Sequence, residues 1–274
     1  MDQGPGPDRG VIDQLHEVWT SIGALGRSLT AGDWDRATDC PGWTVRDQLS
    51  HMIGTESMLA GRSAPPPAPE GLTHVHNPIG QMNEAWVEAR RARPGPELLA
   101  EFDELTAARL AGLRAMTDEQ LVTPGPSPIG TVPYAVFMDV RVMDCWVHEQ
   151  DIRRAVDQPG HLEGPAVDAA LRRFGSSLGF VVAKRAGAPD GTEVVVDLRG
   201  ASARCFAVAV HDGRAAETEP GPEPTVRVVT DVETYACLVS GRWTAERALG
   251  EGRVSLEGDT SLGRAVIDAL NILP

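Results

Sequence analysis

Asp144 and His148 lie four residues apart in the segment RVMDCWVHEQ, a spacing that places both side chains on one face of a helix. Apolar residues such as Phe137 and Val140 occupy nearly every side of this predicted helix, which indicates that it is buried. A buried carboxylate needs a partner that offsets its lost hydration. A divalent metal ion bound by the carboxylate and the imidazole would be such a partner.

The pair alone does not decide between a metal site and a buried ion network. Arg141, Arg153 and Arg154 lie on the same predicted helix and could neutralise Asp144 without any metal. Carboxylate–histidine pairs at this spacing are also common on helices. The spacing by itself therefore favours the ion network and leaves the metal site as the alternative.

A third ligand would have to come from another helix, and His51 is the first candidate. It lies in a predicted helix that begins after Thr44, with Asp47 in place to complete a capping box. The apolar stripe of that helix passes through Leu49 and Met52, whereas His51 falls beside small and polar residues. This position can line a cavity between helices or face water, and the spacing alone favours water.

The remaining reactive side chains give weaker signals. His74 and His76 form an HxH pair in a proline-flanked loop, where solvated histidines are the simpler interpretation. The four cysteines are far apart in the sequence and form no CxxC pair, which favours reduced thiols in a reducing compartment. We find no GxSxG, P-loop or GxGxxG segment.

The composition excludes several classes of partner. With 39 acidic and 25 basic residues the net charge is −14, and such a surface repels the phosphate backbone of nucleic acid. No stretch approaches the roughly 18 uncharged apolar residues of a membrane span. The first ten residues, MDQGPGPDRG, lack the basic and apolar regions of a signal peptide. We therefore expect a cytoplasmic protein with a disordered leader at 1–10.

Hydrophobic periodicity predicts helices in the first part of the chain and strands after about residue 190. A loop is predicted at 123–133, where proline and glycine are frequent. The predicted helices are 11–30, 45–61, 79–92, 96–116, 134–156, 165–184, 231–240, 243–249 and 260–271, and the predicted strands are TEVVVDL, RCFAVAV and PTVRVVT. The pattern indicates an all-α bundle at 11–160 followed by a small α+β domain at 161–274.

Two segments together resemble the mycothiol-dependent maleylpyruvate isomerase family, whose N-terminal domain is a DinB-like four-helix bundle. CPGWTVRDQLSHMIGTE at 40–56 is similar to the family's turn, threonine cap and histidine-bearing helix. RVMDCWVHEQDIRRA at 141–155 is similar to the helix that supplies a carboxylate and a histidine. The resemblance covers about residues 10–160. It implies that His51, Asp144 and His148 bind one divalent metal ion, with zinc expected.

The resemblance also implies a reaction. The expected co-substrate is mycothiol, the low-molecular-weight thiol of actinobacteria, whose sulfur would attack a small electrophilic substrate. The isomerase carries Glu where this chain has Asp144, so we expect thiol S-transfer or a related addition rather than strict maleylpyruvate isomerisation. The thiol-contacting residues and any catalytic acid are not predicted.

Residues 225–270 resemble sterol-carrier-type domains, which often follow the bundle in this family. This leaves two alternatives open. One is a non-catalytic small-molecule or lipid-binding protein in which the metal is structural or absent. The other is a zinc-dependent hydrolase that uses the same three ligands and a bound water. The sequence predicts no oligomeric state.

Overall fold

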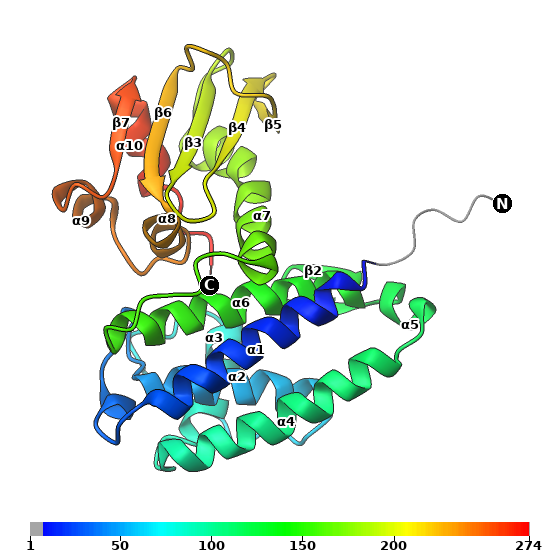
Figure 1. Ribbon diagram of the computed structural model, residues 1–274. Helices are drawn as coiled ribbons and strands as arrows, with labels where there is room; N and C mark the ends of the chain where they lie inside the picture. Colours follow the sequence, from blue (N-terminus) through cyan, green and yellow to red (C-terminus); the bar gives the residue numbers. More distant parts are fainter. Residues whose placement is uncertain (1–7, 274) are drawn as a thin grey trace. The chain divides into compact units, whose positions relative to one another are not determined.

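The computed structural model describes residues 8–273 and divides them into two compact units, of which the first ends at His161 and the second covers Leu162–Leu273 (Figure 1). A helical bundle precedes an α+β unit, so the predicted fold class is confirmed. Residues 1–7 of the predicted leader lie outside the described residues, and helix α1 already begins at Gly10. None of the helices in the described part of the chain has the length and apolar character that a membrane span requires.

The long helices α1, α2, α4 and α6 form the bundle of the first unit (Figure 1). Helix α1 (Gly10–Ser28) packs against α4 (Gly95–Ala115) and α6 (Tyr134–Ala155), and α2 (Val45–Leu59) packs against the same two helices. Each helix therefore contacts two neighbours around a shared apolar core. The shorter elements of this unit are η1 (Asp33–Asp35), α3 (Pro78–Glu88), α5 (Asp118–Val122), β1 (Pro124–Ser127) and β2 (Gly130–Pro133).

Helix α2 begins at Thr44 through the predicted capping box. The Thr44 side chain accepts a hydrogen bond from the Asp47 backbone N–H, and the Asp47 carboxylate accepts one from the Thr44 backbone N–H at 2.9 Å. Asp47 is buried and also accepts from Arg91 at 3.0 Å, which links the start of α2 to the segment after α3. This box fixes the first turn of the helix on which His51 lies.

The predicted loop at 123–133 is wrong, because this segment contains a β-hairpin. Strand β1 pairs antiparallel with β2, and Ser127 donates to the carbonyl oxygen of Gly130 at 2.6 Å across the turn. The sequences PGPS and GTVP carry proline and glycine in place of the alternating β-branched residues that predict strands. The hairpin is stabilised by packing against α6, which sequence periodicity does not report.

The second unit is a five-stranded sheet packed with helices. The strand order is β5-β4-β3-β6-β7, in which β3 and β6 are parallel and the other pairs are antiparallel. Helix α7 packs on β4 and β5, α8 on β3 and β6, and α10 on β6 and β7. The elements are α7 (Pro165–Phe180), η2 (Val181–Arg185), β3 (Glu193–Arg199), β4 (Arg204–His211), β5 (Arg214–Glu217), β6 (Val226–Asp231), α8 (Val232–Val239), α9 (Ala245–Gly250), β7 (Ser255–Gly258) and α10 (Thr260–Asp268).

The close approach of α2 to α3 depends on Gly54. A methyl group added there would lie 2.4 Å from Cβ of Trp86, which is close to the backbone and cannot move aside. We therefore expect Gly54→Ala to lower the free energy of unfolding by about 1–3 kcal/mol. Gly112→Ala on α4 is the matched control, because nothing lies within 4 Å of its added methyl group.

The Gly112→Ala control should raise the stability by up to about 1 kcal/mol through helix propensity. Urea denaturation of both variants measures the two effects. If Gly54→Ala were as stable as the wild type, the tight α2–α3 contact would not exist in solution.

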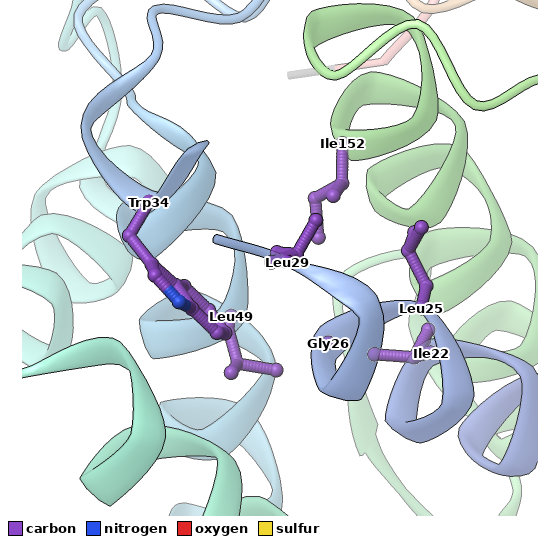
Figure 2. A pocket seen from close by; sticks show the side chains of 7 residues that line it. All are labelled: Ile22, Leu25, Gly26, Leu29, Trp34, Leu49 and Ile152. Atoms are coloured by element: carbon purple, nitrogen blue, oxygen red, sulfur yellow. The ribbon is translucent and has the colours of Figure 1, made fainter. Parts of the chain in front are cut away.

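A small apolar cavity lies among α1, η1, α2 and α6 in the bundle (Figure 2). Its lining residues are Ile22, Leu25, Gly26, Leu29, Trp34, Leu49 and Ile152. No ionisable side chain lines it, so this cavity offers no group for acid–base or metal chemistry. The side chains that could bind a metal lie elsewhere in the bundle, on α2 and α6.

Candidate metal centre

Three potential metal ligands meet between α2 and α6. The Nε2 atom of His51 lies 3.2 Å from one carboxylate oxygen of Asp144, and Nε2 of His148 lies 3.5 Å from the other. One ligand atom from each residue lies within 4.8 Å of the other two. The imidazole rings pack edge to face with their centroids 4.6 Å apart. The structure thus brings together the three residues that the sequence resemblance singled out.

The burial of these residues corrects two expectations from helical spacing. His51 is 3% exposed, so the water-facing position favoured by its spacing on α2 is wrong. His148 is also buried, at 6%. Asp144 was expected to be buried, but its side chain is 28% exposed. The two imidazoles are therefore enclosed, and the carboxylate forms the solvent-facing edge of the cluster.

The charge states of these groups suit metal coordination. Burial lowers the pKa of His51 to about 4, so its imidazole is neutral at pH 7. Burial alone would raise the pKa of Asp144, but the adjacent Arg141 guanidinium and the imidazoles hold this pKa well below its usual range. Metal ions bind neutral imidazole and ionised carboxylate, which are the charge states of His51 and Asp144 here.

The ion network that competed with the metal hypothesis is also present. Arg141 donates to Asp144 and, at 3.0 Å, to Glu56, which is fully buried. Glu56 also accepts from Arg109 at 2.9 Å, and Arg109 donates to the Tyr134 hydroxyl at 2.9 Å. The sequence identified Arg141 as a possible partner of Asp144, whereas Glu56 was not identified. A single glutamate in a helix usually indicates a solvated face, so the sequence carries no signal for it.

Trp43 packs beside both histidines. Its ring centroid lies 5.1 Å from that of His51 and 5.7 Å from that of His148, and its Nε1 donates to Glu84 at 2.7 Å. Gly42 precedes it with φ at 78°, a left-handed conformation that favours glycine at this turn. The Cys-Pro-Gly-Trp turn thus supplies an aromatic wall to the cluster. His74 contacts Glu84 at 3.1 Å and is not among the three clustered ligands.

Cys145 follows Asp144 but faces the bundle interior. The thiol is fully buried, and this burial raises its pKa to about 12. The side chain lies 3.4 Å from a guanidinium nitrogen of Arg141. Cys145 therefore packs in the core and is not available as a nucleophile.

The donor set fits a catalytic type of metal site. Two imidazole nitrogens and one carboxylate oxygen are the three protein ligands typical of catalytic zinc centres. Nε2 of His51 on α2 and Nε2 of His148 on α6 both face the Asp144 carboxylate, so the three donor groups lie around one point. The residues therefore fit a divalent metal ion.

His161, to which the sequence assigned no role, belongs to a separate polar cluster at the end of the first unit. Its Nδ1 donates to the buried Glu149 at 2.7 Å, and its Nε2 lies 3.4 Å from Glu17. Burial alone would lower the pKa of His161, but the hydrogen bond and charge of Glu149 outweigh it and raise this pKa. The stabilisation from a raised pKa is complete below the unfolded value of 6.5 and is lost as the pH rises through the folded value.

We therefore expect His161→Gln to lower the free energy of unfolding by about 1–3 kcal/mol at pH 6 and by less at pH 9. Urea denaturation at both pH values measures this difference. The exposed His211 on β4 gives the control, because His211→Gln should change stability little at either pH. If His161→Gln lowered the free energy of unfolding more at pH 9 than at pH 6, the assignment of a protonated imidazole would be contradicted.

A four-helix bundle with a His–Asp–His cluster between α2 and α6 defines a DinB-like helical class. Residues 15–153 match the sequence profile of the mycothiol maleylpyruvate isomerase N-terminal domain. The chain belongs to this family, which confirms the resemblance in its two motif segments.

Two comparisons with individual proteins agree with this membership. An uncharacterised protein of Mycobacterium tuberculosis, found in two strains, is 30% identical over 156 residues, or 56% of this chain and 57% of the relative. The chain thus spans about half the length of the curated relatives it matches. The crystal structure of the mycothiol-dependent maleylpyruvate isomerase has a TM-score of 0.55 at 16% identity, over 90% of this chain and 92% of that one. A histidine-to-alanine variant of that isomerase has a TM-score of 0.53. At this identity, the structural likeness concerns the fold.

Proposed function

We propose that the protein is a metal-dependent enzyme that uses mycothiol to attack a small electrophilic substrate. His51, Asp144 and His148 hold zinc or another divalent metal. The observation that carries this proposal is the convergence of their three ligand atoms within 4.8 Å in a bundle of the isomerase family. Family membership supports an enzyme over a non-catalytic carrier.

A bound zinc ion would lower the pKa of a coordinated thiol and stabilise the thiolate. The protein prepares the site for this chemistry with its own side chains. His51 is held neutral by burial, and Arg141 holds the Asp144 carboxylate in its ionised form. Trp43 shields the imidazoles from one side, while the exposed edge of Asp144 marks the approach for the thiol and the substrate.

The reaction that we favour is S-transfer. The thiolate sulfur forms a bond to an electrophilic carbon, and the leaving group departs with its electron pair. With a maleyl-type substrate, the sulfur would add to the double bond, and its expulsion after rotation would give the trans isomer. Asp144 is one methylene shorter than the glutamate of the isomerase, which supports a related rather than an identical reaction.

The bundle carries the chemistry, and the α+β unit at Leu162–Leu273 has a sterol-carrier-like character whose ligand is open to experiment. A thiol-dependent reaction belongs in a reducing compartment, so we place the protein in the cytoplasm.

The test is metal content by mass spectrometry on protein purified without chelator. We expect about one metal ion per wild-type chain and none in folded His51→Ala, Asp144→Ala and His148→Ala variants. His76→Ala is the matched control, because His76 is exposed and outside the cluster. A wild type that stays empty after incubation with zinc would overturn the proposal and leave the three residues as part of the ion network.

Turnover assays then separate the reactions. Product formation from electrophiles only in the presence of mycothiol supports the thiol-dependent enzyme. Equal turnover without thiol would identify a hydrolase that uses the same ligands. If neither activity is found and an apolar ligand stays bound through purification, the results would support a non-catalytic binding protein.

A further inference from the structure

A chain of hydrogen bonds leads from the Trp43 turn to His148. The Thr38 hydroxyl donates its proton to the carbonyl oxygen of Trp43 at 2.8 Å. Because a hydroxyl has one proton, Thr38 can only accept from its other partners. The side-chain nitrogen of Gln48 donates to it at 2.7 Å, and the Cys40 backbone N–H donates at 3.2 Å. Thr38 therefore fixes which end of the buried Gln48 amide points toward it.

The orientation of this amide determines the protonation of His148. The oxygen of Gln48 faces Nδ1 of His148 at 2.5 Å, and an amide oxygen only accepts. A carboxylate oxygen of Asp151 lies 3.5 Å from the same nitrogen and also only accepts. Nδ1 must therefore carry the proton. In a neutral imidazole, Nε2, which faces Asp144, then carries no proton and can offer its lone pair to a metal.

His51 has no comparable hydrogen bond at its Nδ1 in the described part of the chain. Its Nδ1 is buried and has no hydrogen-bond partner among residues 8–273. Its Nε2 contacts Asp144 at 3.2 Å, and a neutral His51 would donate a proton there. Only His148 is therefore held in the tautomer whose Nε2 can bind a metal, whereas no neighbouring side chain holds His51 in that tautomer among the described residues.

We infer that Gln48, oriented by Thr38, is a positioning residue that sets the Nδ1-protonated tautomer of His148 for metal coordination. This inference rests on the proposed metal site. Neighbours that fix the tautomer of a histidine ligand typically change metal affinity by about 10- to 100-fold. Gln48 and Thr38 should therefore control zinc affinity although neither belongs to the ligand set.

Three variants test this chain of hydrogen bonds. The measured quantity is the zinc affinity, determined by competition with a chromophoric chelator. Gln48→Leu removes the acceptor and should weaken zinc binding about 10- to 100-fold. Gln48→Glu keeps an acceptor toward Nδ1 and should retain affinity within about threefold of the wild type. Thr38→Val releases the amide so that its nitrogen can face His148, and should weaken binding about 10-fold or more.

Thr55→Val is the matched control for the lost hydroxyl. Thr55 lies on α2 and donates to the backbone oxygen of His51 at 3.2 Å, so its loss leaves the tautomer of His148 unchanged. Its zinc affinity should equal that of the wild type. Circular dichroism verifies that each variant is folded.

A second readout does not need the metal. Nitrogen-15 NMR of the chelator-treated protein distinguishes the two tautomers of His148, and we expect the Nδ1-protonated form in the wild type and a mixture in Thr38→Val. Zinc binding unaltered in Gln48→Leu and Thr38→Val, or a wild type protonated at Nε2, would overturn the inference. A wild type with the expected tautomer that binds no metal would instead overturn the proposed function.

Discussion

Replacing Glu56 with Gln is expected to lower the free energy of unfolding by about 3–5 kcal/mol. Glu56 is fully buried and accepts hydrogen bonds from Arg109 and Arg141. The substitution keeps the shape of the side chain but removes the negative charge that these two guanidinium groups share. Arg141 is itself buried, and Asp144 would remain as its ionic partner.

Urea denaturation measures this effect, with Asp103→Asn as a surface control. Asp103 pairs with Arg27 at 2.9 Å, but both side chains are about half exposed, at 47% and 56%. Loss of such a pair typically changes stability by less than about 1 kcal/mol. Similar values for the two variants would show that Glu56 is not held between buried charges in solution.

Addition of zinc is expected to stabilise the wild-type protein strongly. A ligand that binds only the folded state at about 1,000 times its dissociation constant raises the free energy of unfolding by about 4 kcal/mol. The donors of the site come from α2 and α6, which the unfolded chain does not hold together. Excess chelator should therefore lower the midpoint of thermal unfolding, and zinc should restore it.

His148→Ala should abolish this dependence on zinc, while His76→Ala should retain it. Differential scanning calorimetry with zinc or with chelator compares the three proteins directly. A wild type whose midpoint is the same under both conditions would contradict metal binding by the folded bundle.

The fold could largely be predicted from hydrophobic periodicity. The long helices appear within a few residues of their predicted limits because each carries an apolar stripe over several turns. The hairpin at β1–β2 and the strands β5 and β7 were missed, because PGPS, RAAE and SLEG lack the β-branched alternation of typical strands. The helix predicted at 165–184 changes at Val181 to the wider π-helical turn η2, a change that propensity does not encode.

The candidate site was predicted less well from spacing than from resemblance. Helical spacing identified Asp144 and His148 as a pair but favoured a solvated His51, which the structure buries. The two motif segments of the family identified all three residues. The supporting groups Gln48, Thr38 and Glu56 were missed, since their roles depend on hydrogen bonds between segments distant in the sequence.

The packing of Trp43 against both histidines gives the molecule an optical reporter. Indole emission responds to an ion bound nearby, and the centroid of the Trp43 ring lies 5.1 Å from that of His51 and 5.7 Å from that of His148. The chain has six tryptophans, and a Trp43→Phe difference spectrum isolates the signal of this one. Occupancy of the cluster can therefore be followed by fluorescence titration or stopped flow without an added dye, including the rate at which an ion enters and leaves.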